Sequence, residues 1–352
     1  MQGITEMEAP VKTIKRYKIS MDESPGMRWN HVINDNLDQL TKAMSELEKM
    51  IPSGWISYGV EKTLAACAYF DLVMYSKELY SISELTRIPV GKLIILQLYY
   101  ELNAHCTSIV TDSKDGVCLT RTMDWELPML KDLTIEVEFV SRNKIMFIAT
   151  TWVGCVGIFT GMKPGGYAVS LNYRRTNDSL FLNIAKTITY CWPSSFLIRE
   201  VLTNCETYGE AVRILSNSQL IAPCYLTIAS ADYDPGTAKN ANGQNIDPRG
   251  CILIRDRHGL FSCAKNPELL QNSATGYIVQ TNHDKYVEPN GDNIVYSYER
   301  IQQFDKMMNL QLVSDPVKLM EKLTSFPLIN EETIYTTQMI PRTGELKTRV
   351  FV

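Results

Sequence analysis

Cys106 and the polar stretch around it carry the residue types in this sequence that could do chemistry. The segment HCTSIVTDSKDGVCLTRTMDW (105–125) contains two strand-like runs separated by the Asp-Gly pair at 115–116, which is a strong hairpin signal. A reversal at this pair would bring Arg121 and Asp124 close to Cys106. A guanidinium favours the thiolate form of cysteine, and the thiolate is the nucleophilic form. The spacing therefore makes Cys106 a candidate nucleophile.

The residues alone leave open what would activate this thiol. A buried cysteine is most often a small apolar core residue, so Cys106 could be purely structural. His105 directly precedes it and should point to the opposite face of a strand, while His258 and His283 stand in no recognisable protease signature. If the peptide bond before Cys106 is cut, the new amino group, with a pKa of about 7.7 to 8.0, can accept the thiol proton.

The elements that must position this stretch change type near residue 105. Before it, apolar residues recur every three or four positions in 37–51, and two more helices are expected at 58–75 and 91–102. After it, apolar and polar residues alternate, as in DLTIEVEFV (132–140). Further strands are expected at 144–152, 167–174, 224–230, 251–256, 276–282 and 333–340, helices at 179–190, 194–204, 207–216 and 315–324, and an exposed loop at 231–250. Asp315 and Pro316 should open the last helix. This grouping predicts a layered α+β fold.

Composition excludes several classes of protein. The 352 residues are 45% hydrophobic, which is enough for a large core, and the net charge is −4 without a long run of Lys or Arg. Nucleic-acid binding therefore has no electrostatic basis. The nine cysteines are scattered, with no C-x-x-C pair and no Cys/His spacing typical of zinc, so we expect reduced thiols and no metal site.

Two further features bear on location. The most apolar segments, 64–75 and 91–102, are shorter than the roughly 18 to 20 residues that cross a bilayer, so buried or interfacial helices are expected. The sequence as written begins without the basic and apolar regions of a secretory signal, which predicts a cytoplasmic protein. One glycosylation sequon is present at 177–179.

Longer motifs extend the interpretation beyond Cys106. The pattern CTSIV…DG…RTMDW is similar to the start of the catalytic chain of acid ceramidase and N-acylethanolamine acid amidase, a family of N-terminal-nucleophile hydrolases. The segments YKISMDESPGMRWNHV, KELYSISELTRIPVGKLIILQLYYEL, TTWVGCVGIFTGMKPGGYAVSLNYR, VQTNHDKY and IYTTQM follow in the order of that family, so the resemblance covers about 16–352. It implies an αββα sandwich preceded by a helical N-terminal segment, and no cofactor.

The resemblance also implies that the chain cuts itself between His105 and Cys106. The products would be an N-terminal helical chain, 1–105, and a catalytic chain, 106–352, which stay associated. Cys106 matches the family's nucleophile. Its own amino group would then be the base, and no histidine would be required.

Four other residues match functional positions of the family. Arg121 and Asp124 match the pair that holds the thiol and the amino group of the nucleophile. Asn282, in QTNHD, matches the side-chain donor of the oxyanion hole, and Arg300 is the counterpart of a later active-site arginine. The resemblance thus implies an active site of Cys106, Arg121, Asp124, Asn282 and Arg300.

Tyr173 departs from the family pattern. In SLNYRR an acidic residue usually stands where Tyr173 does, followed by the arginine that Arg174 matches. A phenol with a pKa of about 10 stays neutral and cannot supply a negative charge. Slower autocleavage or turnover is therefore expected, unless a neighbour such as Asp178 compensates.

The implied activity is hydrolysis of the amide bond of an N-acyl lipid. The substrate would be ceramide, giving sphingosine and fatty acid, or an N-acylethanolamine, giving fatty acid and ethanolamine. Two alternatives stay open: a lipid-binding relative that no longer cleaves itself, and hydrolysis of bile-acid or penicillin-like amides, which does not fit the helical first hundred residues. A lysosomal location is the alternative if the N-terminus is incomplete. The N-terminal helices could also contact a membrane surface to collect the substrate.

Overall fold

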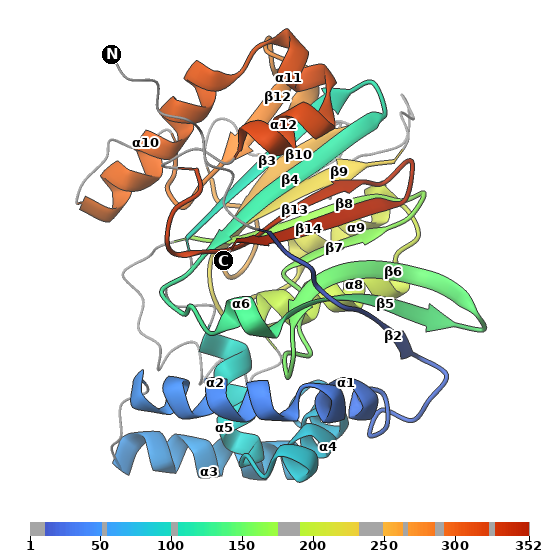
Figure 1. Cartoon of the computed structure of the whole chain (residues 1–352), viewed down its shortest axis with the longest axis vertical. Helices are drawn as coiled ribbons and strands as arrows, with labels where there is room; N and C mark the ends of the chain where they lie inside the picture. Colours follow the sequence, from blue (N-terminus) through green and yellow to red (C-terminus); the bar gives the residue numbers. More distant parts are fainter. Residues whose placement is uncertain are drawn as a thin grey trace.

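The computed structural model describes most of the chain in eight stretches (Figure 1). These are residues 11–50, 55–99, 105–174, 191–231, 249–262, 267–285, 292–323 and 328–351. The expected helix at 179–190, the sequon at 177–179 and nearly all of the expected loop at 231–250 lie outside them.

The first hundred residues form a group of helices at one end of the molecule (Figure 1). Two short strands come first, β1 (Val11–Lys12) and β2 (Arg16–Ser20), and then α1 (Asn30–Asp35), α2 (Leu37–Met50), α3 (Trp55–Tyr69), α4 (Ser76–Thr86) and α5 (Val90–Tyr99). The helices predicted at 37–51 and 91–102 are confirmed as α2 and α5. Gly91 lets α5 approach α3 closely, because a Cβ atom there would lie 2.0 Å from the carbonyl oxygen of Glu61.

The single helix predicted over 58–75 is wrong. The chain turns after α3, where Asp71 and Tyr75 adopt the left-handed conformation with φ of 59° and 57°. A left-handed residue cannot continue a right-handed helix, so α3 ends at Tyr69, residues 70–75 form a turn, and α4 begins only at Ser76. Apolar periodicity alone did not reveal this break.

The rest of the chain forms two mostly antiparallel sheets. The strands are β3 (His105–Ser113), β4 (Gly116–Asp124), β5 (Thr134–Ser141), β6 (Lys144–Trp152), β7 (Thr160–Lys163), β8 (Tyr167–Tyr173), β9 (Cys224–Ser230), β10 (Gly250–Arg255), β11 (Glu268–Leu269), β12 (Tyr277–Gln280), β13 (Thr333–Ile340) and β14 (Glu345–Phe351). One sheet has the order β1-β14-β13-β4-β3-β12, and the other β11-β10-β9-β8-β7-β6-β5-β2. β2 runs parallel to β5. All strands predicted from alternation are confirmed, whereas β7 and β14 were missed.

Helices cover the outer faces of the two sheets. They are α8 (Ser194–Asn204), α9 (Tyr208–Asn217), α10 (Asp292–Met307), α11 (Leu310–Ser314) and α12 (Pro316–Lys322). Two short elements lie elsewhere: α6 (Leu130–Leu133) contacts α2, and the 3₁₀ turn η2 (Leu270–Asn272) contacts β3 and β10. α8 and α9 pack on the eight-stranded sheet, and α10 to α12 lie over the six-stranded sheet (Figure 1). Asp315 caps α12 as predicted, since its side chain accepts a hydrogen bond from the backbone N–H of Lys318. The layers are helix, sheet, sheet, helix, so the predicted α+β αββα class is confirmed.

A buried ionic cluster joins the N-terminal helices to the sandwich. Arg199 of α8 donates to both carboxylate oxygens of Glu78 of α4, each at 2.7 Å, and Trp29 donates to the same carboxylate at 2.6 Å. Burial would raise the pKa of Glu78, but the charge and hydrogen bonds of Arg199 outweigh it and lower that pKa. Glu78 is therefore an ionised, fully partnered group at the junction of the two parts. None of the helices among the described residues is long and apolar enough to span a membrane.

Candidate active site

The β3–β4 hairpin presents Cys106 beside Arg121. The strands reverse through a two-residue turn between Ser113 and Gly116, and Gly116 takes the positive φ, 115°, that such a turn requires. This register places Cys106 opposite Met123. The hairpin predicted from the sequence, with the return strand beside Cys106, is confirmed.

The two faces of this hairpin separate Arg121 from Asp124. Side chains alternate along a strand, so residues three apart point to opposite faces. Arg121 lies between the two sheets, where its Nη2 atom donates to the Cys106 Sγ atom at 2.8 Å and to the carbonyl oxygen of Leu171 at 3.0 Å. Its Nη1 atom donates to the Thr160 hydroxyl at 2.6 Å. The guanidinium is fully buried and holds the thiol directly.

Asp124 lies on the other face, toward α10. It accepts a hydrogen bond from the Thr333 hydroxyl at 2.6 Å, and its other oxygen is 3.4 Å from Nη1 of Arg300. Burial raises the pKa of Asp124 to about 6, although the charge of Arg300 opposes this shift. The carboxyl group is thus largely protonated in acid and ionised at neutral pH.

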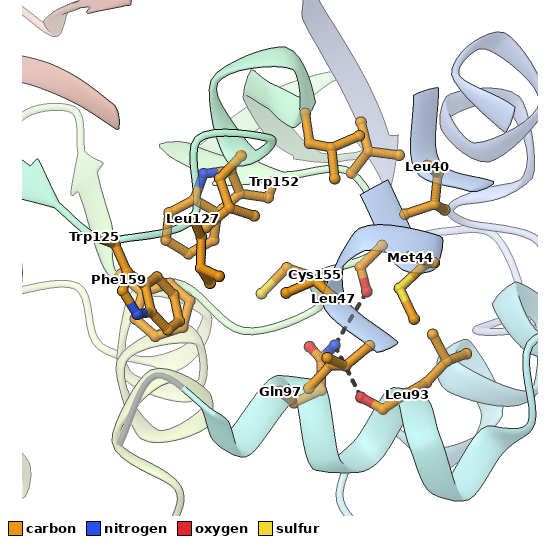
Figure 2. A pocket seen from close by; sticks show the side chains of 15 residues that line it. Leu40, Met44, Leu47, Leu93, Gln97, Trp125, Leu127, Trp152, Cys155 and Phe159 are labelled. Carbon is orange, nitrogen blue, oxygen red and sulfur yellow. Dashed lines mark hydrogen bonds between the residues drawn. The ribbon is translucent and has the colours of Figure 1, made fainter. Parts of the chain in front are cut away.

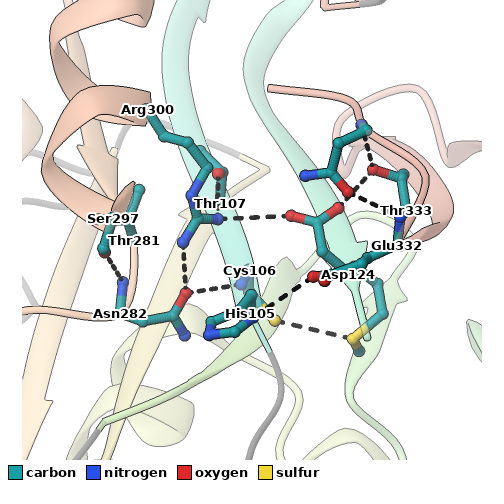
Figure 3. A network of polar contacts seen from close by, with 12 residues as sticks. His105, Cys106, Thr107, Asp124, Thr281, Asn282, Ser297, Arg300, Glu332 and Thr333 are labelled. Carbon is teal, nitrogen blue, oxygen red and sulfur yellow. Dashed lines mark hydrogen bonds and ion pairs between the residues drawn. The ribbon is translucent and has the colours of Figure 1, made fainter. Parts of the chain in front are cut away.

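Asn282 connects the two faces at the backbone of Cys106 (Figure 3). Its Oδ1 atom accepts hydrogen bonds from the backbone N–H of Cys106 at 2.7 Å and from Nη2 of Arg300 at 2.8 Å. Its Nδ2 atom donates to the carbonyl oxygen of Tyr173 at 2.8 Å. The structure therefore places Cys106, Arg121, Asp124, Asn282 and Arg300, the five residues named through the family resemblance, in one cluster.

His283 supports the loop that carries Asn282. The backbone N–H of Asn282 donates to the Ser297 hydroxyl at 2.9 Å, and that hydroxyl is 2.9 Å from Nδ1 of His283. Burial, with the charges of Arg300 and Lys285, lowers the pKa of His283 to about 4. His283 is thus engaged with a hydroxyl of α10, and His258 is exposed whereas the thiol is buried. The arrangement does not support a protease-like Cys–His pair.

Tyr173 and Arg174 stand at the end of β8. Tyr173 contributes its carbonyl oxygen to Asn282, as described above. Arg174 forms a two-bonded ion pair with Asp284, at 2.9 and 2.8 Å, and a further bond to Asp256 at 2.6 Å. Its contacts with Asp284 anchor the segment two residues after Asn282. Asp178, considered above as a compensating acid, lies outside the described residues.

His105 is the first residue of β3 and pairs with Asp124. Its Nδ1 atom is 3.7 Å from the carboxylate of Glu332, on the loop before β13 (Figure 3). The bond between His105 and Cys106 therefore lies inside the sheet, beside the cluster. A nucleophile at Cys106 has its own preceding peptide bond within reach.

Several residues of this cluster were missed by sequence analysis. Thr107 accepts from Arg300 at 3.0 Å, and the Tyr335 hydroxyl accepts from Nη1 of Arg121 at 3.1 Å. Asn172 accepts from Ser108 at 2.6 Å and donates to the carbonyl of Gln280 at 2.9 Å. These are ordinary threonines, tyrosines and asparagines within alternating strands. Only their place beside β3 distinguishes them, and nothing in the sequence could have indicated it.

An apolar pocket lies next to the cluster, between the N-terminal helices and the sandwich (Figure 2). It is lined by Leu40, Met44, Leu47, Leu93, Leu96, Gln97, Trp125, Leu127, Leu130, Leu133, Trp152, Val153, Gly154, Cys155 and Phe159. The Trp152 ring contacts the Tyr335 ring at 5.9 Å between centroids, and Phe159 adjoins Thr160, which binds Arg121. The pocket is thus connected to Cys106 through Tyr335, Thr160 and Arg121. Within the described residues no group of His, Cys, Asp or Glu could hold a metal ion.

Two models of known protein families match this chain and define its class of enzyme. Residues 106–309 match the model described as linear amide C–N hydrolases, choloylglycine hydrolase family. Residues 12–68 match the model for the beta subunit of N-acylethanolamine-hydrolyzing acid amidase. The first match begins at Cys106 itself, so the residues around the thiol are those of an amide hydrolase.

Individual relatives show to which family of amide hydrolases the chain belongs. An uncharacterised protein of Acanthamoeba polyphaga mimivirus is 30% identical over 92% of this chain and 96% of its own length. The N-acylethanolamine-hydrolyzing acid amidase of Caenorhabditis elegans and the acid ceramidase of Bos taurus are each 28% identical, over 93% and 94% of this chain and 89% and 85% of theirs. A solved structure of the Caenorhabditis elegans amidase ortholog aligns with a TM-score of 0.56 at 26% identity, covering 70% of this chain and all of that one. The chain belongs to the acid ceramidase and N-acylethanolamine acid amidase family of amide hydrolases.

Proposed function

We propose that this protein hydrolyses the amide bond of N-acyl lipids with Cys106 as an N-terminal nucleophile that its own cleavage exposes. The observation that carries the proposal is that two side chains bind Cys106, one at its sulfur and one at its backbone nitrogen. Arg121 binds its Sγ atom at 2.8 Å, and Asn282 binds its backbone nitrogen at 2.7 Å. The thiol and the nitrogen that would become the terminal amine are thus fixed at the same end of β3.

The first step would be cleavage of the precursor. The Cys106 Sγ atom attacks the carbonyl carbon of His105, and the acyl group moves from nitrogen to sulfur, which leaves a thioester and a free amine. Water then hydrolyses the thioester, releasing a carboxylate on His105 and restoring the thiol. The new amine can accept the thiol proton in later turnovers.

The second step would repeat this chemistry on the substrate. The thiol attacks the amide carbonyl, the amine product leaves with a proton, and water releases the fatty acid from the thioester. The side-chain amide of Asn282 lies beside Cys106 and is an N–H donor, so we assign stabilisation of the oxyanion to Asn282. Arg300 fixes the orientation of that amide through its bond to Oδ1.

The apolar pocket supports a fatty-acyl substrate. Its lining is apolar except for Gln97, whose polar atoms bind backbone groups. A chain of methylene groups gains about 0.8 kcal/mol for each one buried, so such a pocket would favour long acyl chains. Ceramide and N-acylethanolamines share this acyl group, and the proposal covers both.

The two chains should stay together after cleavage, with 1–105 as the N-terminal chain and 106–352 as the catalytic chain. The Glu78–Arg199 pair crosses from one to the other and is fully buried. Removing one partner of a buried pair typically costs about 3–5 kcal/mol. The two family matches, over 12–68 and 106–309, also lie on either side of the proposed cut.

An exposed apolar patch on the N-terminal helices supports contact with a membrane surface. It consists of Tyr69, Phe70 and Leu72, at the end of α3 and directly after it, which are 76%, 71% and 51% exposed. Aromatic and aliphatic side chains in such a cluster can enter the interfacial region of a bilayer. The substrate is itself insoluble, so this contact would place the enzyme where the lipid is.

The test is the intact mass of the purified full chain after incubation at about pH 4.5 and about pH 7, beside a Cys106→Ala control. We expect the wild type alone to separate into 1–105 and 106–352, and the cleaved protein to release fatty acid from ceramide or palmitoylethanolamide. A chain that stays whole at both pH values and releases no fatty acid would overturn the proposal. Such a chain that still binds fatty acid would be the lipid-binding relative instead.

A further inference from the structure

Gln97 is the polar residue of the apolar pocket, and it lies on the N-terminal side of the proposed cut. It belongs to α5 and is 4% exposed. Its Nε2 atom donates to the carbonyl oxygen of Gly154 at 3.1 Å and, within α5, to that of Leu93 at 3.4 Å (Figure 2). Its Oε1 atom accepts from the backbone N–H of Val156 at 2.8 Å. One side chain of α5 thus binds two backbone groups of the segment 153–157.

The segment 153–157 has the irregular backbone of a connection, not a strand. It joins β6 to β7, and Gly154 adopts a left-handed φ of 84°. Val153, Gly154 and Cys155 line the pocket. Because no neighbouring strand in the described part of the chain binds the Gly154 carbonyl or the Val156 N–H, the side-chain amide of Gln97 forms these hydrogen bonds instead. The shape of this pocket wall therefore depends on a residue from another part of the chain.

Residues of α8, in the sandwich, also bind this segment and the residue after it. Arg199 donates to the carbonyl oxygen of Val156 at 2.9 Å, and the backbone N–H of Ile158 donates to the carbonyl oxygen of Ser195 at 3.0 Å. These bonds fix the part of the segment nearer β7 and Thr160. In the part that faces the pocket, the backbone N–H of Val153 donates to the carbonyl oxygen of Leu133, and Gln97 adds its bonds to Gly154 and Val156, so its loss should alter the pocket more than the thiol.

We propose that Gln97 is a specificity-determining positioning residue, which sets the acyl-chain preference by holding the backbone of 153–157 as one wall of the pocket. The inference rests on the proposed function. After cleavage Gln97 would belong to a different polypeptide from the segment it holds. The N-terminal chain would then be a lasting part of the substrate site.

Glutamine suits this position because its amide offers both N–H donors and a carbonyl acceptor without a charge. Gln97→Leu removes both bonds and leaves two backbone groups without their partner. Gln97→Glu keeps the acceptor for the Val156 N–H but loses the donor to the Gly154 carbonyl. The two variants should therefore show graded effects, with the leucine variant the stronger.

The experiment compares full-chain wild type, Gln97→Leu, Gln97→Glu and the exposed control Gln39→Leu on α2. The substrates are a butyryl and a palmitoyl amide of the same fluorogenic amine. For Gln97→Leu we expect KM for the palmitoyl amide to rise about tenfold, with kcat, autocleavage and kcat/KM for the butyryl amide within about twofold of wild type. Gln97→Glu should fall between Gln97→Leu and wild type, and Gln39→Leu should match wild type.

A second measurement keeps this inference separate from the proposed chemistry. Affinity for a fluorescent palmitate analogue is measured on each variant in the Cys106→Ala background, where neither cleavage nor turnover is needed. Weaker binding by both Gln97 variants, but not by Gln39→Leu, supports the role. An unchanged chain-length profile and unchanged affinity would overturn it, even if the wild type is active. If the wild type is inactive but Gln97 still governs affinity, only the proposed function fails.

Discussion

The polar centre at Cys106 and the apolar pocket beside it differ in which parts of the chain build them. The contacts given for the thiol and the backbone nitrogen of Cys106 come from residues after 105, Arg121 and Asn282, and Arg300 in turn binds Asn282. The pocket takes Leu40, Met44 and Leu47 from α2 and Leu93, Leu96 and Gln97 from α5. The described polar centre is thus built from residues after 105, whereas the apolar pocket combines residues of the N-terminal helices with residues of the sandwich such as Trp125, Trp152 and Phe159.

This difference teaches how one fold could keep its chemistry while its substrate changes. Groups that act on an amide need fixed hydrogen bonds, which neighbouring strands of two packed sheets supply at close range. A pocket for an acyl chain needs only apolar surface, which any amphipathic helix can supply. Variants of the centre should therefore affect all substrates equally, and variants of the helices should affect long-chain lipids selectively.

The largest effect is expected at the centre. Asn282→Ala removes the amide that binds the Cys106 nitrogen and is proposed to stabilise the oxyanion. The loss of one oxyanion donor typically lowers kcat by about 10²–10³-fold. We expect this loss to be the same for butyryl and palmitoyl amides, measured on protein that has already been cleaved. A loss confined to the palmitoyl amide would break the distinction between centre and pocket.

A gain should follow from restoring an acid at the end of β8. Tyr173→Glu places a carboxylate where the family usually has one, and a hydrogen bond to a charged group is worth about 1.5–3 kcal/mol. We expect autocleavage to become about tenfold faster, followed by intact mass over time at about pH 4.5. Tyr173→Gln is the control for size and polarity. Equal rates for the Glu and Gln variants would contradict a role for the charge.

A smaller effect is expected on the helical side. Phe70→Ser with Leu72→Ser removes two exposed apolar side chains from the patch, which lowers the apolar area that can enter a bilayer. Binding to vesicles of phosphatidylcholine with anionic lipid should weaken about fivefold, measured by co-sedimentation, with hydrolysis of the soluble butyryl amide unchanged. Ile145→Ser, at an exposed position on β6, is the matched control. Equal losses in both proteins would count against a defined membrane surface.

The smallest effect concerns pH and Asp124. The folded chain raises the pKa of Asp124 to about 6, above its ordinary value of 3.8, so it binds this proton more tightly than the unfolded chain does. The resulting stability is present in acid and is lost as the pH rises through that interval. The test compares two proteins that both carry Cys106→Ala, one with Asp124 and one with Asp124→Asn. As the pH rises, the Tm of the protein with Asp124 should fall relative to that of the Asn variant, by about 2–4 °C for each kcal/mol of unfolding free energy lost. A Tm difference that does not change between about pH 4 and pH 7 would contradict the raised pKa.

Much of the fold could be predicted from the sequence because local patterns determine it. Alternation identified strands such as β5 and β13, and apolar periodicity identified α2 and α5. The turn at 70–75 that ends α3 was missed, because the spacing of apolar residues does not reveal the positive φ of Asp71 and Tyr75. Short or polar strands such as β7 and β14 were missed because their pairing partners define them.

In the candidate site, too, contacts between neighbours in sequence could be predicted and contacts between distant segments could not. The hairpin signal at 115–116 was enough to bring Arg121 to Cys106, since that contact lies between neighbouring strands. Asn282 and Arg300 were named only through resemblance to a family, because they are more than 170 residues away in sequence from their contacts with Cys106 and Asp124. Thr107, Thr160 and Tyr335 were not named at all. Their role comes from packing between sheets, which local patterns do not report.

By itself, the sequence determined the main secondary-structure elements and the candidate nucleophile. It showed helices before residue 105, most of the strands after it, and a cysteine at the start of a hairpin. Only the tertiary structure decided that Arg121 faces the thiol while Asp124 faces Arg300, because alternate side chains of one strand enter different layers. It also decided that Gln97 and Glu78 from the N-terminal helices bind backbone and arginine groups of the sandwich. Such contacts depend on how distant segments pack, which no short stretch of sequence contains.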